Sequence, residues 1–486
     1  MPRRTRREFL EDSMFATAAA MATTTATNAF AQEQETPKSA NERLNVAVVG
    51  VRGRGGSHIG AFAGRQDTQV TWVVDPDRNI GGDRAEEIGK RQNGQSPKFA
   101  TDLREMLEDS SVDIVSIATP NHWHALASIW AIQAGKDVYV EKPVSHNVSE
   151  GRRIVEAARK YEKIVQTGTQ CRSNPGMREA IKFVQDGGIG QLKVARGLCY
   201  KRRGSIGPRG EYKVPPHIDY NLWLGPAPEE ALTRPQFHYD WHWQWSYGNG
   251  DLGNQGIHQM DLARWGLGES KLCQGVFSYG GRLGYEDAGE TANTQVVVHD
   301  YGDTSLVFEV RGLNTDAYQG AKVGVIFEGT DGYVVMTSYD SGTAFDLDGQ
   351  ATRTFKGGGD HFGNFKKAVR SRKISDLNAD IEEGHLSSAL CHLGNISYSL
   401  GESTGIEDAA ATVGEMNAPE NMKATFERTM THLGKNNVAL DTAKITLGPH
   451  LKFDPKSETF VDHATADTML TRPYRAPFVV PKAGEV

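Results

Sequence analysis

The 486-residue sequence lacks the features that mark several large classes of protein. Its four cysteines form no CxxC pair, which excludes a thioredoxin-type redox motif and a structural zinc site of the usual spacing. His385 and His392 stand two helical turns apart without a third ligand at a useful spacing, so we expect no metal. No stretch reaches the roughly 18 apolar residues that a membrane-spanning helix needs. The formal charge of −7 leaves no basic surplus for phosphates, so we expect neither a membrane nor a nucleic acid as partner.

The first 31 residues show the features of an export signal in the usual order. Arg6 and Arg7 precede a mildly apolar run of small residues, and 29–31 read Ala-Phe-Ala, an AxA cleavage site. This order is typical of the twin-arginine route, which carries proteins that fold before export; a disordered basic tail is the alternative. We therefore expect residues 32–43 to be a polar linker and the mature protein to work in the periplasm or another extracytoplasmic space.

Strand and helix patterns alternate between residues 44 and 168. Buried-strand runs such as LNVAVVG and VDIVSIA are separated by helical patterns, which predicts an α/β domain with a Rossmann-type, doubly wound parallel sheet. Residues 169–400 hold strand-rich segments joined by short turns, which predicts an α+β domain with a largely antiparallel, open sheet. Helical stretches at 364–373 and 381–401 are expected to cover one of the sheets. Residues 401–486 are interpreted as an extension with one helix and a proline-containing tail.

A glycine-rich turn follows the first strand. Gly50, Gly53 and Gly55 allow a tight turn and let a pyrophosphate approach backbone N–H groups at a helix N-terminus. The strict GxGxxG spacing is not met, because Arg52 or His58 takes a glycine position, depending on which glycine starts the count. An ordinary glycine-rich turn therefore remains an alternative.

Asp75 ends the next strand, about 25 residues beyond the first glycine of the turn. An acidic side chain at this position can accept both hydroxyls of an adenosine ribose and would repel a 2′-phosphate. The turn and Asp75 together favour NAD over NADP, although Arg78 nearby weakens the preference. A turn aspartate in the DPDR segment is the alternative.

Two further segments carry candidate catalytic side chains. Lys142 stands at the end of a strand, at the rim where doubly wound sheets place ligands, and can donate to a substrate hydroxyl. Asn254, His258 and Asp261 have spacings of four and three, which place them on one helix face if the segment is helical. His258 has the residue type of a general base at neutral pH. A turn lysine and a structural histidine are the alternatives.

An aromatic segment precedes His258. Trp241, Trp243 and Trp245 suit stacking on a sugar ring, and their period of two equally suits one face of a buried strand at a subunit contact. Arg172 is a candidate substrate ligand, with a surface salt bridge as the alternative. The sequence leaves both pairs of alternatives open.

Taken together, these segments resemble the Gfo/Idh/MocA family of NAD(P)-dependent sugar and polyol oxidoreductases. The resemblance covers about residues 44 to 400 and rests on the glycine turn and on the motifs TPNHWH (119–124), EKP (141–143), GTQCR (168–172) and GxHxxD (256–261). It implies cofactor contacts from Gly50, Gly53, Arg54, Gly55, Asp75, Thr119, Asn121, His124 and Glu141. It implies Lys142 and His258 as the catalytic pair, and substrate contacts from Arg172, Trp243, Asn254 and Asp261.

One position departs from the family pattern. The family commonly has an aspartate four residues before the catalytic histidine, and this chain has Asn254 there. An amide neither takes a proton nor stabilises an imidazolium by charge, so we expect His258 to be less basic and the substrate to differ from inositol- and glucose-type compounds.

The resemblance implies an NAD-dependent oxidoreductase that acts on CH–OH groups of a sugar, polyol or sugar acid. Because free NAD is not maintained outside the cytoplasm, we expect a tightly bound nucleotide and a redox-neutral reaction. We also expect a homo-oligomer formed through the C-terminal sheet. The alternatives are a non-catalytic, NAD-containing glycan-binding protein and an NAD-assisted epimerase or glycosidase-like lyase.

Overall fold

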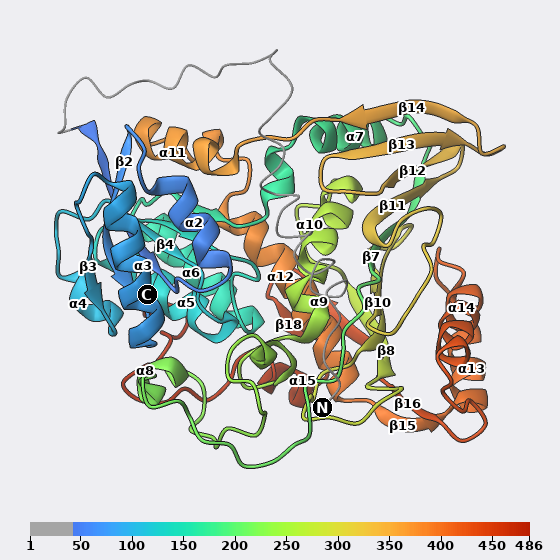
Figure 1. Ribbon diagram of the computed structural model, residues 1–486. Helices are drawn as coiled ribbons and strands as arrows, with labels where there is room; N and C mark the ends of the chain where they lie inside the picture. Colours follow the sequence, from blue (N-terminus) through green and yellow to red (C-terminus); the bar gives the residue numbers. More distant parts are fainter. Residues whose placement is uncertain (1–41) are drawn as a thin grey trace, which may run out of the picture. The chain divides into compact units, whose positions relative to one another are not determined.

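The computed structural model describes residues 42–486, of which Leu44–Val486 form one structural unit (Figure 1). The expected export signal and nearly all of the expected linker lie outside the described residues. Within 42–486, no helix combines the length and the apolar character needed to cross a bilayer.

The first sheet of Leu44–Val486 has six parallel strands in the order β3-β2-β1-β4-β5-β6. Its strands are β1 (Leu44–Val49), β2 (Thr68–Val74), β3 (Lys98–Ala100), β4 (Ile114–Ile117), β5 (Asp137–Val140) and β6 (Val165–Thr167). The connecting helices are α2 (Arg54–Phe62), α3 (Arg78–Arg91), α4 (Leu103–Leu107), α5 (Asn121–Gln133) and α6 (Val148–Lys160). The predicted Rossmann sheet is confirmed, and its order reverses between β1 and β4, the switch point where such sheets bind ligands.

Local sequence explains why these elements form. Every residue of β4 and β5 is buried, as expected for strands covered by helices on both faces. Asn147 caps α6 by accepting a hydrogen bond from the backbone N–H of Glu150. The side chain of Asp77 caps α3 in the same way.

The second sheet of this unit has twelve strands, antiparallel except for the pair β7–β10. Its strands are β7 (Leu192–Cys199), β8 (Gly275–Gly281), β9 (Thr294–Asp300), β10 (Ser305–Arg311), β11 (Val323–Gly329), β12 (Gly332–Met336), β13 (Ser341–Asp346), β14 (Ala351–Lys356), β15 (Glu402–Gly405), β16 (Lys444–Leu447), β17 (Leu451–Asp454) and β18 (Thr459–Phe460). The predicted, largely antiparallel sheet is confirmed.

Helices cover both faces of this second sheet. The remaining helices are α7 (Pro175–Gln185), α8 (Tyr220–Leu224), α9 (Gly250–Asn254), α10 (Gly256–Leu267), α11 (His361–Ser371), α12 (Ile381–Ser399), α13 (Ile406–Gly414), α14 (Met422–Lys435) and α15 (Ala464–Thr468). Helices α10 and α12 lie on one face, and α13 and α14 on the other (Figure 1). Neighbouring residues of β10 follow this division, because Phe308 packs with the α10 side and Val307 with the α14 side.

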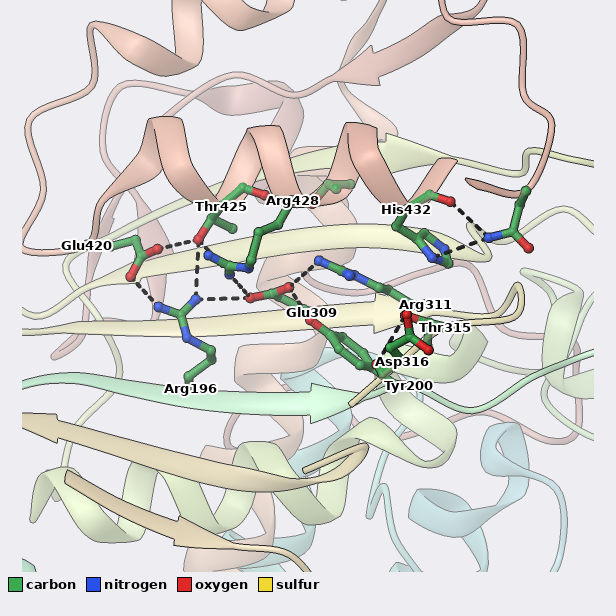
Figure 2. A network of polar contacts seen from close by, with 12 residues as sticks. Arg196, Tyr200, Glu309, Arg311, Thr315, Asp316, Glu420, Thr425, Arg428 and His432 are labelled. Atoms are coloured by element: carbon green, nitrogen blue, oxygen red, sulfur yellow. Dashed lines mark hydrogen bonds and ion pairs between the residues drawn. The ribbon is translucent and has the colours of Figure 1, made fainter. Parts of the chain in front are cut away.

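A buried network of charged side chains links α14 to the face of the second sheet that α13 and α14 cover (Figure 2). The carboxylate of Glu309, on β10, accepts hydrogen bonds from Arg196 at 3.0 Å, Arg428 at 2.6 Å and the hydroxyl of Tyr200 at 2.6 Å. Burial alone would raise the pKa of Glu309, but the guanidinium groups of Arg196, Arg428 and Arg311 hold this pKa at about 2. The network therefore belongs to the packing of α14.

Two segments differ from the sequence-based expectation. Residues 401–486 contain four strands as well as helices, and β15, β16 and β17 join the second sheet. The chain then returns to the first sheet, where the ring of Phe478 packs edge-on against Trp123 with 5.5 Å between centroids. The two late helices also do not share one sheet, because Phe362 and Phe365 of α11 pack in the core of the first sheet, whereas α12 packs against α6 and β8.

Candidate functional site

A cavity of about 360 Å³ opens at the carboxyl ends of β1, β2, β4 and β5. Its other walls come from α9, α10 and the segment 238–242, so the Rossmann sheet and the second domain enclose it together. Eleven residues expected in the site line this cavity: Gly50, Gly53, Arg54, Asp75, Thr119, Asn121, His124, Glu141, Lys142, Asn254 and His258. The cavity lies at the switch point of the sheet, where ligands of doubly wound folds bind.

The glycine turn leaves the start of α2 open. Gly53 has φ +52°, and a Cβ at this position would meet no atom within 4 Å. No side chain caps α2, and the N–H groups of Gly55 and Gly56 donate to the carbonyl oxygens of Arg52 and Gly53, so of the first three N–H groups of this helix that of Arg54 remains for an anionic ligand. Gly55 does not line the cavity; a Cβ there would fall 2.1 Å from the carbonyl oxygen of Gly50, so it serves the close packing of helix and turn.

Asp75 is fixed at the end of β2 on the cavity wall. Its carboxylate accepts hydrogen bonds from the backbone N–H groups of Val51 and Asp77, each at 3.0 Å. Burial raises the pKa of Asp75 to about 6 in spite of these two donors. The carboxylate is therefore held in one orientation and is ionised at neutral pH.

Glu141 forms the centre of a buried ion cluster below the turn. It accepts a hydrogen bond from Nε of Arg54 at 2.7 Å and lies 3.2 Å from Nε2 of His58. Burial alone would raise the pKa of Glu141, but Arg54, His58 and Lys142 hold it well below the ordinary value. Glu141 thus carries the negative charge that balances Arg54 and Lys142.

Two polar side chains at the start of α5 line the cavity wall. Asn121 donates to the side-chain oxygen of Asn249 at 3.1 Å, which links the Rossmann domain to α9 of the second domain. His124 is wedged between the carbonyl oxygens of Thr119 and Pro143. Burial lowers the pKa of His124, and the contacts with the two carbonyl oxygens fix the orientation of its ring.

Lys142 and His258 face the same cavity from the two domains. The ammonium group of Lys142 donates to the backbone carbonyl of Asn254 at 2.8 Å, which is a neutral acceptor. Burial lowers the pKa of Lys142 to about 8, and burial next to Lys142 lowers the pKa of His258 well below its ordinary value. At neutral pH this gives a protonated lysine beside an unprotonated histidine, which is the combination of a proton donor and a general base.

Buried polar atoms without partners gather at this cavity. Arg54 Nη2, Thr119 Oγ1, Gln170 Oε1 and His258 Nδ1 are buried and make no hydrogen bond within the part of the chain that the structure describes. A buried polar atom without a partner is costly, so such atoms point to a ligand that completes them. Together with the uncapped helix start and Asp75, the donor set fits a dinucleotide with a polar substrate beside it.

The structure does not bring all expected site residues to the cavity. Arg172 donates to the carboxylate of Asp261 at 2.8 Å, and the exposed fractions of the two residues are 5% and 0%. Asp261 also accepts from the hydroxyl of Ser387 at 2.7 Å. Both side chains are thus occupied with each other behind α10, and neither the expected substrate contact nor the alternative of a surface salt bridge describes Arg172.

The aromatic segment takes a form that the period of two did not predict. Residues Asp240–Trp243 form a 3₁₀ helix rather than a strand. Trp243 is buried against Ile206 and Ala288 instead of lining the cavity. Trp241 lines the cavity in its place, with its ring stacked on that of His242 at 3.6 Å between centroids.

Sequence reasoning missed several cavity residues. Gln170 belongs to the GTQCR motif and could have been found from it. Tyr239 lines the cavity at φ +69°, a conformation that a tyrosine rarely adopts and that no sequence signal announced. His238 also lines the cavity and binds the carboxylate of Asp77 at 2.9 Å. Among residues 42–486, no group of three His, Cys, Asp or Glu side chains is placed to hold a metal.

Comparison with known proteins agrees with this geometry. The Gfo/Idh/MocA model described as an oxidoreductase family with an NAD-binding Rossmann fold matches residues 44–169. The companion model, described as the C-terminal alpha/beta domain of the oxidoreductase family, matches residues 206–433.

Curated relatives match over part of their length. Levoglucosan dehydrogenase from Pseudarthrobacter phenanthrenivorans is 26% identical over 37% of this chain and 39% of its own length. Inositol 2-dehydrogenase from Corynebacterium glutamicum is 28% identical over 34% of this chain and 48% of its own length. The matched region thus spans less than half of either relative.

Solved structures share the fold over a longer stretch. Levoglucosan dehydrogenase, in complex with NADH and levoglucosan, has a TM-score of 0.54 at 19% identity and covers 73% of this chain and 96% of that one. The WlbA dehydrogenase from Bordetella pertussis, in complex with NADH and UDP-GlcNAcA, has a TM-score of 0.54 at 19% identity over 73% of this chain and 95% of that one.

Proposed function

Because the chain belongs to the Gfo/Idh/MocA oxidoreductase family, we propose that it is an NAD-dependent oxidoreductase acting on a CH–OH group of a sugar, polyol or sugar acid. One observation carries this proposal: Lys142 and His258, from different domains, line the same cavity as the glycine turn and Asp75. The names of the levoglucosan and inositol dehydrogenases among its relatives support a carbohydrate-type substrate.

The residues that would hold NAD are those of the Rossmann half of the cavity. The open start of α2 at Gly53 suits the pyrophosphate, and the fixed carboxylate of Asp75 suits the ribose hydroxyls. Asn121 and Thr119 lie on the wall toward Lys142, which suits the nicotinamide end. Bound there, NAD supplies the acceptor for the hydride that leaves the substrate carbon. Since Asp75 would meet a 2′-phosphate with like charge, we infer a preference for NAD over NADP.

The chain's own side chains then handle the hydroxyl proton. The ammonium of Lys142 donates to the substrate oxygen and stabilises the negative charge that develops on it. His258 is neutral and accepts the hydroxyl proton as general base. Asn254 supports Lys142 through its backbone carbonyl, so the amide in place of the family's aspartate does not remove the lysine's anchor.

We further propose that the protein is exported by the twin-arginine route with its nucleotide tightly bound, and that it forms a homo-oligomer through the C-terminal sheet. The Arg6-Arg7 pair and the AxA site support export. Replacing both arginines by lysine should leave the precursor in the cytoplasm, whereas undiminished export would contradict this part of the proposal.

The test of the function is spectroscopic. Purified protein is denatured and the released nucleotide identified; native protein is then given a panel of sugars, polyols and uronic acids while absorbance is followed at the reduced-nicotinamide band. We expect bound NAD(H) and a substrate-dependent change in this band. Nucleotide without any spectral change would instead indicate the non-catalytic glycan-binding protein. Asp75→Ser should narrow the preference for NAD, and a wild type that binds NADP at least as well would contradict the role of Asp75.

A further inference from the structure

A second cavity of about 470 Å³ is separate from the first one and shares no lining residue with it. Its walls come from the segment after β5, the segment 245–249, α12 and the C-terminal segment 468–473. Its volume is in the range of small-molecule sites, roughly 300–1,000 Å³. Asn249 stands between the two cavities, because it lines the second and accepts a hydrogen bond from Asn121 of the first.

Arg472 lines this second cavity and has two donor nitrogens that make no hydrogen bond within residues 42–486. Its Nη1 donates to the backbone carbonyl of Ser246 at 2.9 Å, which fixes the guanidinium plane. Its Nε and Nη2 are buried and have no hydrogen-bond partner among residues 42–486. The carboxylate of Glu150 lies 3.7 Å from Nε but accepts its hydrogen bonds from His146 N and Asn147 Nδ2. Two N–H groups on one guanidinium edge match the two oxygens of a carboxylate.

Two histidines add unpartnered polar atoms. His392 has an exposed fraction of 4%, binds the hydroxyl of Ser145 through Nε2 and has no partner at Nδ1. His146 has no partner at Nε2. Burial lowers the pKa of both rings, so each is neutral and can donate to or accept from a hydroxyl group.

The indole of Trp245 supplies an apolar wall to the same cavity. A flat aromatic ring beside polar groups suits the C–H face of a sugar ring, whose hydroxyls then meet the polar side. Asn249 and Asn395, both buried, contribute further amide groups to the wall.

We propose that this second cavity is a ligand site for a monosaccharide-sized sugar acid. The carboxylate binds the Nε–Nη2 edge of Arg472, the hydroxyls meet His146 and His392, and the ring lies against Trp245. The site is separate from the cavity of Lys142 and His258, so the proposal does not depend on the proposed oxidoreductase activity.

The test measures binding by calorimetry with NAD-loaded full-length protein carrying Lys142→Ala, so that turnover contributes no heat. Glucuronate and galacturonate are the probes, and glucose is the uncharged comparison. We expect at least one of the two acids to bind about tenfold or more tightly than glucose. Arg472→Gln should abolish this preference, and Arg472→Lys should retain only part of it, since lysine keeps the charge but loses the paired N–H groups.

Matched controls separate this site from the first cavity and from misfolding. Arg475→Gln removes a nearby arginine that binds Asn221 outside the cavity and should leave acid binding unchanged. Trp245→Ala should weaken binding of the acid without touching Arg472. A crystal soaked with the acid should show it beside Arg472. The proposal is overturned if neither acid binds at millimolar concentration, or if binding survives Arg472→Gln in folded protein.

Discussion

Two regions at helix α10 differ in how their buried charges are paired. One is the cavity in front of the helix, with Lys142 and His258, and the other is the polar cluster behind it, around Arg172 and Asp261. In front, the ammonium of Lys142 binds only a neutral carbonyl, and Nδ1 of His258 has no partner in the described chain. Behind, Arg172 and Asp261 form a 2.8 Å ion pair to which Ser387 adds a further hydrogen bond. His258 and Asp261 are only one helical turn apart. A buried cation without a carboxylate in hydrogen-bond contact therefore marks the side that awaits a ligand, and a cation held between the carboxylates of Asp261 and Glu383 marks the side that holds the fold.

The largest expected effect is on turnover and comes from substitutions of the two cavity residues, Lys142 and His258. Lys142→Ala or His258→Ala should reduce the turnover number by about 10²- to 10⁴-fold, because a positioned acid or base contributes about that much. Nucleotide affinity should change little, since Asp75 and the glycine turn are untouched. The measurements are steady-state kinetics and calorimetric NAD binding. Lys193→Ala, at a partly exposed lysine bonded to Gln191, is the control. A variant at Lys142 or His258 with full turnover would refute the proposed pair.

A substitution in the cluster of Arg172 and Asp261 should instead lower stability and change turnover little. Asp261→Ala removes the buried partner of Arg172 and leaves only the more exposed Glu383, 3.0 Å from Nη2, so we expect a cost of up to about 3–5 kcal/mol of unfolding free energy. The turnover number of the molecules that remain folded should stay within a few-fold of wild type. Chemical denaturation and active-site-normalised kinetics measure the two quantities.

An exposed ion pair provides the control for Asp261. Asp186→Ala, which removes the exposed partner of Lys182, should cost less than about 1 kcal/mol. If Asp261→Asn kept its stability but lost turnover, Asp261 would have to be returned to the substrate site.

The cavity residues could be predicted from the sequence better than the pairing of Arg172 with Asp261. β4 and β5 are short, fully buried apolar runs, and side chains at their carboxyl ends meet at one edge, so Glu141, Lys142 and the glycine turn could be placed together. Arg172 and Asp261 are 89 residues apart, and no local pattern reveals that they pair.

Short or unusual segments escaped sequence reasoning for physical reasons. β3 has three residues and β18 has two, too few for a period of two to be visible. The aromatic segment carries that period but forms a 3₁₀ helix after Tyr239 at positive φ, because packing of Trp243 overrides local preference. The roles of the individual cavity residues stay predictions until variants are measured.

The pH dependence of the rate sharpens the comparison further. Burial lowers the pKa of Lys142 to about 8, so in the free enzyme kcat/KM should fall about tenfold per pH unit above that value, as the proton donor is lost. In Lys142→Arg this falling limb should disappear from the accessible range, because arginine keeps its proton. A limb that persists in Lys142→Arg would belong to another group.

The same pKa shift affects stability with a defined sign. An unfolded lysine keeps its proton up to about pH 10.4, whereas the folded Lys142 releases it near pH 8. Between these values the unfolded chain binds more protons, so the contribution of Lys142 to stability rises with pH through this window and is constant below it. Lys142→Ala should remove this contribution, which denaturation at pH 7 and pH 9.5 can detect.

The smallest expected effect concerns Asn254, which lines the cavity beside Lys142. Its side-chain amide lies 3.4 Å from a carboxylate oxygen of Asp251, and this carboxylate is paired with Arg203 at 2.6 Å. Asn254→Asp would place a second negative charge beside Asp251 and one turn from His258. That charge should raise the pKa of His258 and of Lys142, because a neighbouring negative charge favours the protonated form of both groups. The alkaline limb of kcat/KM should therefore move upward, while the maximal rate changes less than tenfold.

Asn254→Ala separates the added charge from the lost amide. This variant removes the contact with Asp251 but keeps the backbone carbonyl that accepts from Lys142, so its pH profile should match that of wild type. The measurement is the pH profile of kcat/KM, recorded with one substrate for wild type, Asn254→Asp and Asn254→Ala. If the Asp and Ala variants shift equally, the amide contact and not the charge sets the pKa of the catalytic pair. A shift seen only in Asn254→Asp would show that the lack of a carboxylate at position 254 sets the pKa values of Lys142 and His258 in this chain.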